Sequence, residues 1–86
     1  MTTKTYEVKT SNGSYWQVHH VAASTEQEAS ELAVRDADKA LIEERKMAAQ
    51  AGLAAPGRYV AFSVVEKVVG DMPARGIRFV DSGAEG

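Results

Sequence analysis

A single amphipathic stretch from Ser24 to Gly52 constrains the fold of this 86-residue chain more than any other feature. Small and apolar residues recur in it at three- and four-residue spacing, which is typical of one face of an α-helix. The segments on both sides of it alternate in polarity, as half-buried strands do. This ββαββ order predicts an α+β fold in which a single long helix packs on one face of one antiparallel sheet.

The two segments before the helix form a predicted hairpin. Residues 5–10 and 15–23 alternate between apolar and polar side chains, and Asn12-Gly13 lies between them. Asn-Gly favours a type I′ turn, in which both central residues take positive φ. The sequence therefore predicts two antiparallel neighbours at the start of the chain.

Three segments follow the helix. Residues 58–69 are the longest β-rich run, residues 70–76 have the composition of a loop, and residues 77–80 can form a short fourth strand. A right-handed crossover through the helix brings the third strand beside the first. We therefore expect a sheet of three to four strands in the order 2-1-3-4, a single domain over residues 1–80, and a flexible tail over residues 81–86.

The ends of the helix carry recognisable signals. Ser24 with Gln27, or Thr25 with Glu28, completes a capping box, and Gly52 suits the position after the last turn. A helix of this length spans about 40 Å, whereas a strand of about nine residues spans about 30 Å. The C-terminal turns are therefore expected either to overhang the sheet and pack against a partner, or to fray.

The size of Trp16 decides which face of the sheet we assign to the core. Tryptophan has the largest apolar area available, so its side of the second strand is expected to lie under the helix. The other side, which carries Tyr15, His19 and Tyr59, then has no helix to cover it. An uncovered apolar face is typical of a protein interface, so we expect a homodimer or another protein partner there.

The same aromatic face leaves a second interpretation open. Tyr15 and Tyr59 can stack on single-stranded bases, as aromatic sheet surfaces do. The net charge of −2 disfavours nucleic acid as a partner, because such proteins need a basic surface.

Acidic residues crowd the outer surface of the predicted helix beyond what helix capping requires. Two further carboxylates, Asp36 and Glu44, interrupt its apolar stripe. An acidic ridge can bind a basic surface of another protein. The candidate partner-binding residues of this ridge are Glu28, Glu31, Asp38 and Glu43.

The sequence offers no recognisable motif for catalysis, a metal or a cofactor. His19 and His20 are adjacent in a strand and point to opposite faces, so they cannot chelate one ion. The chain has no cysteine, which excludes disulfides and thiolate metal sites. We therefore expect a non-enzymatic protein without metal or cofactor.

Hydropathy indicates no contact with a membrane. No apolar run approaches the roughly 20 residues of a membrane span. The first residues lack the apolar stretch of a signal peptide. The expected location is the cytoplasm.

Spaced residues across positions 5–69 carry a resemblance to a group of known proteins. The residues are Tyr6-x-Val8, Asn12-Gly13, Trp16-x-Val18 and Ala22-x-Ser24-x-x-Gln27-Glu28-Ala29, followed by a helix and a valine-rich strand. This pattern resembles small ββαβ proteins of phages and mobile elements, including some anti-CRISPR inhibitors, and the antitoxin half of some toxin–antitoxin pairs. The resemblance implies a non-catalytic inhibitor that occludes a larger, basic, nucleic-acid-handling protein assembly, or an antitoxin-type homodimer.

Overall fold

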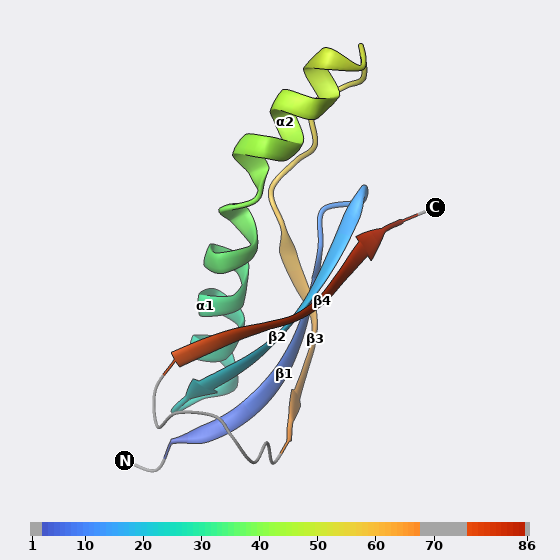
Figure 1. The fold of residues 1–86 in the computed structure, drawn as a ribbon. Helices are drawn as coiled ribbons and strands as arrows, with labels where there is room; N and C mark the ends of the chain where they lie inside the picture. Colours follow the sequence, from blue (N-terminus) through green and yellow to red (C-terminus); the bar gives the residue numbers. More distant parts are fainter. Residues whose placement is uncertain (1–2, 68–75, 86) are drawn as a thin grey trace.

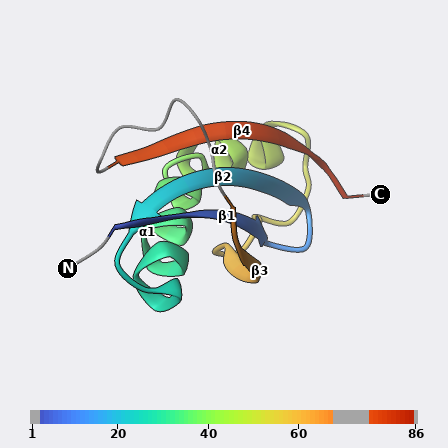
Figure 2. The same cartoon turned by 90° about the horizontal axis from the view of Figure 1, so that it is seen from below.

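The computed structural model describes residues 3–67 and 76–85 and confirms the α+β fold. Strands β1 (Lys4–Ser11) and β2 (Tyr15–Ala23) precede helices α1 (Glu26–Asp38) and α2 (Leu41–Gln50), and strands β3 (Val60–Glu66) and β4 (Gly76–Ala84) follow. The four strands form one antiparallel sheet, and α1 covers one of its faces (Figure 1, Figure 2). Within the described residues, no helix lies on the other face.

The hairpin between β1 and β2 forms as predicted, but its turn is not type I′. Gly13 takes a φ of 87°, whereas Asn12 keeps a negative φ. Oδ1 of Asn12 accepts hydrogen bonds from the backbone N–H groups of Ser14 and Tyr15. The asparagine therefore shapes this turn through its side-chain oxygen.

The strand order is β3-β1-β2-β4. The predicted pairing of the first strand with the second and the third is confirmed. The predicted place of the fourth strand beside the third is wrong, because β4 pairs with β2. β2 has 9 residues against 7 in β3, so it offers the longer free edge for the last strand.

Both outer strands contain an irregularity. The register of β3 against β1 shifts between Lys9 and Thr10, where Phe62 is the additional residue. The register of β4 against β2 shifts between Val18 and His19, where Val80 is the additional residue. One additional residue opposite a regular strand is a β-bulge, which bends the strand that carries it.

β4 is longer than the sequence predicts. It continues to Ala84, so the flexible tail predicted from residue 81 is wrong for residues 81–84. The backbone N–H of Glu85 donates to the carbonyl of Ser14 at 2.9 Å, and the Ser11 hydroxyl donates to the Glu85 carboxylate at 2.7 Å. Residues 70–75 of the predicted loop lie outside the described residues, as do residues 68–69 of the predicted third strand.

The helix is bent, with a turn at residues 39–40 between α1 and α2. Thr25 is the N-cap of α1, because its Oγ1 accepts a hydrogen bond from the N–H of Glu28 at 3.1 Å. This is one of the two capping registers that the sequence leaves open. At the far end, Gly52 takes a φ of 71° and the Leu53 N–H donates to the Ala48 carbonyl at 2.8 Å. This C-cap closes the last turn, so α2 does not fray.

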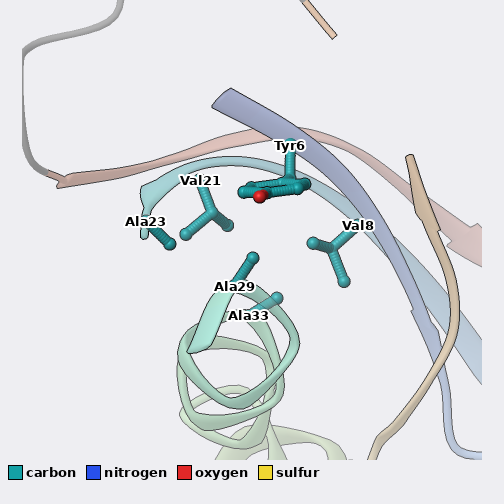
Figure 3. Close-up of a cluster of buried hydrophobic side chains, with 6 residues drawn as sticks. All are labelled: Tyr6, Val8, Val21, Ala23, Ala29 and Ala33. Atoms are coloured by element: carbon teal, nitrogen blue, oxygen red, sulfur yellow. The ribbon is translucent and has the colours of Figure 1, made fainter. Parts of the chain in front are cut away.

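Small residues of α1 let the helix lie close to the sheet. Ala29 and Ala33 are completely buried, four residues apart. Figure 3 shows both methyl groups pointing toward Tyr6, Val8 and Val21 of the sheet. The sheet therefore supplies the bulk of this core, and the helix supplies a flat surface against it.

α2 and the returning residues 51–59 form an arm that projects beyond the sheet (Figure 1). The molecule measures 47 Å along its longest axis and 19 Å along the other two. Ile42 and Leu53 on this arm are 76% and 68% exposed. The overhang that the helix length predicts is therefore confirmed.

Asp38 ties the end of α1 to the approach of β3. Its Oδ1 accepts a hydrogen bond from the Tyr59 N–H at 2.9 Å, and its Oδ2 lies 3.2 Å from Nε of Arg58. The Asp38 side chain is only 15% exposed. A residue expected on an exposed acidic ridge thus holds two parts of the backbone together.

We expect Asp38→Ala to lower the free energy of unfolding by about 1–3 kcal/mol, because a backbone N–H beside β3 loses its acceptor. Urea denaturation followed by circular dichroism measures the change. Glu31→Ala, at an exposed position on the same helix, is the matched control and should change stability by less than about 0.5 kcal/mol. Equal losses in the two variants would contradict the anchoring role of Asp38.

Candidate functional site

The helix covers the face of the sheet that was predicted to be uncovered. His19 and Tyr59 are 0% and 2% exposed beneath the helix, and Tyr15 packs against the cluster that contains Tyr59. The register explains this: core residue Val8 lies opposite His19, so the odd-numbered side chains of β2 point to the helix. Trp16 therefore points to the side without a helix. Base stacking by His19 or Tyr59 is excluded by their burial.

A polar layer lies between the helix bend and the sheet, and His19 is its most buried member. Nε2 of His19 is 3.1 Å from Oδ2 of Asp36, although the contact lies off the direction of a linear hydrogen bond. The Phe79 ring approaches the imidazole edge to face, with centroids 5.9 Å apart. Burial lowers the pKa of His19 below its usual value, against the opposing effect of Asp36. The imidazole is therefore neutral near pH 7.

Tyr59 and Glu44 form the second pair of the polar layer. The Tyr59 hydroxyl donates to Oε2 of Glu44 at 2.6 Å. Burial, reinforced by Glu44, raises the pKa of Tyr59, so the phenol keeps its proton. Nδ2 of Asn12 reaches the other oxygen of Glu44 at 3.4 Å. Asp36 and Glu44, which interrupt the apolar stripe of the helix, thus each contact a polar side chain of the sheet region. Their place in the stripe was the sequence signal for the polar layer.

His19 of the polar layer is closed off from the neighbouring groove. This open groove of about 660 Å³ runs beside the layer, and Asp36 and Glu44 are among its lining residues. The His19 ring has no exposed surface and does not line this groove. A general base must reach the proton that it removes. In this arrangement the imidazole cannot touch a bound molecule.

The described part of the chain shows neither a metal cluster nor a membrane helix. Across residues 3–67 and 76–85, no three His, Cys, Asp or Glu side chains are placed to share a metal ion. No helix in those ranges combines the length and the apolar character needed to cross a membrane. The absence of a cofactor stays a prediction.

The side of the sheet away from α1, which we term the open face, carries exposed apolar residues. Val60, Phe62 and Val65 of β3 are 63%, 60% and 54% exposed. Val65 lies opposite Glu7 and Val60 lies opposite Ser11, so both point to this side. Within the part of the chain that the structure describes, one face of the sheet has no helix on it, but other residues form this face than the predicted ones.

Phe62, Trp16 and Val18 line a shallow cavity of about 360 Å³ on the open face. Lys9 and Asp81 lie at the same cavity. The Trp16 indole lies across Gly83, where an added Cβ would come within 2.6 Å of the ring. Only glycine permits this close approach. The cavity therefore combines an apolar floor with one positive and one negative side chain.

Charged residues of both signs surround this apolar centre. Glu7 accepts a hydrogen bond from Nζ of Lys67 at 3.0 Å and lies 3.2 Å from Nε2 of His20. The hydrogen bond from Lys67 and, to a smaller extent, the contact with His20 lower the pKa of Glu7. On β4, Arg78 lies opposite His20 and Asp81 lies opposite Val18. The open face is thus mixed in charge rather than acidic.

The predicted acidic ridge divides into two kinds of residue. Oε1 of Glu28 accepts a hydrogen bond from the Ser24 N–H at 3.4 Å and completes the cap of α1, while Asp38 anchors β3. Glu28, Glu31 and Glu43 are all exposed. Glu31 and Glu43, which belong neither to the cap nor to the β3 anchor, remain the ridge candidates for contact with a partner.

Comparisons with family models, with curated proteins and with solved structures find no match for this chain. Its function is therefore inferred from the surfaces described above.

We expect the stability of the protein to decrease as the pH falls below 6.5. The pKa of His19 is lowered from 6.5 in the folded state, so the unfolded chain binds the proton first. The resulting slope is at most about 1.4 kcal/mol per pH unit. The pKa of Glu7 is lowered from 4.5, so its own loss of stabilisation belongs to lower pH. Urea unfolding at intervals of half a pH unit measures the slope.

His19→Gln should flatten this slope, even though it also lowers the absolute stability. Val21→Ala removes a fully buried side chain without a titratable group and is the matched control. It should be less stable than the wild type at every pH but keep the slope. A slope that survives His19→Gln would show that another group is responsible.

Proposed function

We propose that this protein is a non-catalytic protein-binding module whose interface is the open face. The observation that carries the proposal is the exposure of Val60, Phe62 and Val65 on a sheet face that no helix of the described residues covers. Contiguous exposed apolar area of this kind marks interaction sites in soluble proteins. An apolar centre with charged residues around it matches the anatomy of a protein interface.

The cavity between Phe62 and Trp16 is the proposed centre of the interface. Aromatic side chains near the middle of an interface carry much of the binding energy. The Trp16 indole is held against Gly83. Binding to a side chain that is already ordered costs little conformational entropy, which favours this site over the projecting arm.

Phe62→Glu should weaken partner binding by about tenfold or more, because it places a charge in the apolar centre. A pull-down from a lysate of the native host, quantified by mass spectrometry, compares the variant with the wild type. Ile42→Glu is the matched control, since Ile42 is even more exposed but lies on the arm. Circular dichroism checks that both variants fold.

The control should retain every partner that the wild type retains. If Ile42→Glu loses those partners while Phe62→Glu keeps them, the arm is the interface and the open face is not.

The narrower form of this proposal is an inhibitor that occludes a larger basic, nucleic-acid-handling assembly. The resemblance to phage and mobile-element proteins supports it. Glu31 and Glu43 are exposed on the bent helix. Their negative charge favours a partner with a basic surface. Occlusion of this kind requires no catalytic group.

Combined Glu31→Gln and Glu43→Gln substitutions should lower the affinity for a basic partner recovered in the pull-down. We expect a loss of about threefold to tenfold at about 50 mM salt and a smaller loss at about 500 mM, because salt screens exposed charges. Isothermal titration calorimetry measures both. Arg35→Gln with Lys46→Gln is the matched pair and should not weaken binding. An affinity that neither salt nor the acidic substitutions change would contradict the role of the ridge.

A further inference from the structure

We propose that the occupant of the open face is a second copy of this chain, related to the first by a two-fold axis. This inference rests on the proposed function, because it identifies the partner of the same face. Two properties of the face support it: its area and the order of its charged and bulky side chains.

The area of the open face suits a small dimer interface. Its four strands, at about 4.8 Å spacing, and eight residues, at about 3.3 Å each, give a flat area of roughly 500 Å². Projecting side chains such as Phe62 and Trp16 enlarge the accessible area. His20 and Ala22 are only 9% and 7% exposed and add little, so the area stays below the roughly 800 Å² per partner of a standard interface, as suits a weak dimer.

Opposite charges occupy adjacent rows across the strands. One row contains Glu7 on β1 and Arg78 on β4, because both lie opposite His20. The next row contains Lys9 on β1 and Asp81 on β4, because both lie opposite Val18. The bulge in β4 is what brings Asp81 into this row. From β1 to β4, the charges are therefore negative and then positive in the first row, and positive and then negative in the second.

A two-fold axis that runs across the strands, between these two rows, makes the face complementary to itself. In a face-to-face pair this axis lies in the interface plane and places each row over the other row of the second copy. Glu7, whose carboxylate also accepts a hydrogen bond from Lys67 of its own chain, then faces Lys9 of the second copy, and Arg78 faces Asp81 of the second copy. Symmetry forms each contact twice. An axis along the strands places Glu7 over His20 instead and forms neither ion pair.

The same axis also matches a large side chain with a small one. On β2, Trp16 lies one row beyond Val18 and Ala22 lies one row beyond His20. Because the indole lies across Gly83 and Gly76 lies opposite Ala22, the axis places the indole over Ala22 and Gly76 of the second copy. Because packed sheets are about 10 Å apart, a tryptophan fits best opposite a small residue. Charge and size thus select the same arrangement.

Sedimentation velocity at protein concentrations from about 1 to 500 μM tests this proposal, since an interface with central ion pairs gives a weak dimer. The wild type should pass from monomer to dimer over this range. Asp81→Arg places two arginines opposite each other on both sides of the axis and should weaken the dimer by about tenfold or more. Arg78→Glu should do the same through opposed carboxylates.

The charge-swapped variant Arg78→Glu with Asp81→Arg is the decisive one. It restores both ion pairs in the proposed arrangement and should recover the wild-type dimer constant to within about threefold. A variant that was merely misfolded would not recover. Single variants that dimerise like the wild type, or a swap that fails to recover, would overturn the two-fold arrangement.

A wild type that stays monomeric at every concentration would overturn the second copy as the occupant. The pull-down separates this failure from that of the proposed function. If the chain is monomeric and Phe62→Glu still loses host proteins, the open face binds a different protein. If Phe62→Glu retains every host protein and the chain is monomeric, both proposals fail.

Discussion

The contact between the alanine residues of α1 and one face of the sheet is the interaction on which the rest of this structure depends. Ala29, Ala33 and Ala37 are completely buried, so the helix lies flat against the strands. Burial of apolar area on this face stabilises the folded chain through the hydrophobic effect. Because α1 lies on one side, no helix among residues 3–67 and 76–85 covers the other face of the sheet. The surface that we assign to binding is thus a direct result of how the core forms.

The polar layer beneath the helix bend continues this contact by different means. Past Ala33, the helix meets His19 and Tyr59 instead of aliphatic residues, and Asp36 and Glu44 supply the facing carboxylates. The hydrogen bond from Tyr59 to Glu44 and the charge contact of His19 with Asp36 both favour one position of the helix along the sheet. Asp38 extends the restriction to the approach of β3. Apolar contacts hold the two layers together, and polar contacts define their alignment.

Local sequence signals predicted the helix and the strands of this fold. The face that the helix covers and the position of β4 depend on contacts between residues that are distant in sequence. Capping residues and alternation correctly placed the helix and the hairpin. The size of Trp16 led to a wrong prediction of the face that the helix covers. Tyr6 and Val8 on β1 indicate the correct face. If the hairpin loop has an even number of residues, Tyr6 and Val8 lie on the same side of the sheet as His19. No local signal indicated that β4 pairs with β2. The composition of Ser82-Gly83 is typical of a loop, and these residues are a strand because they pair with β2.

The bulges in β3 and β4 have a consequence for the behaviour of the chain at high concentration. These are the two outer strands of the sheet, and each exposes one backbone edge to neighbouring molecules. A regular outer edge next to exposed valines such as Val60, Val65 and Val80 invites strand addition and fibril growth. An additional residue at Phe62 and at Val80 interrupts the row of hydrogen-bonding groups on each edge. The protein can therefore display apolar side chains without offering a template for amyloid.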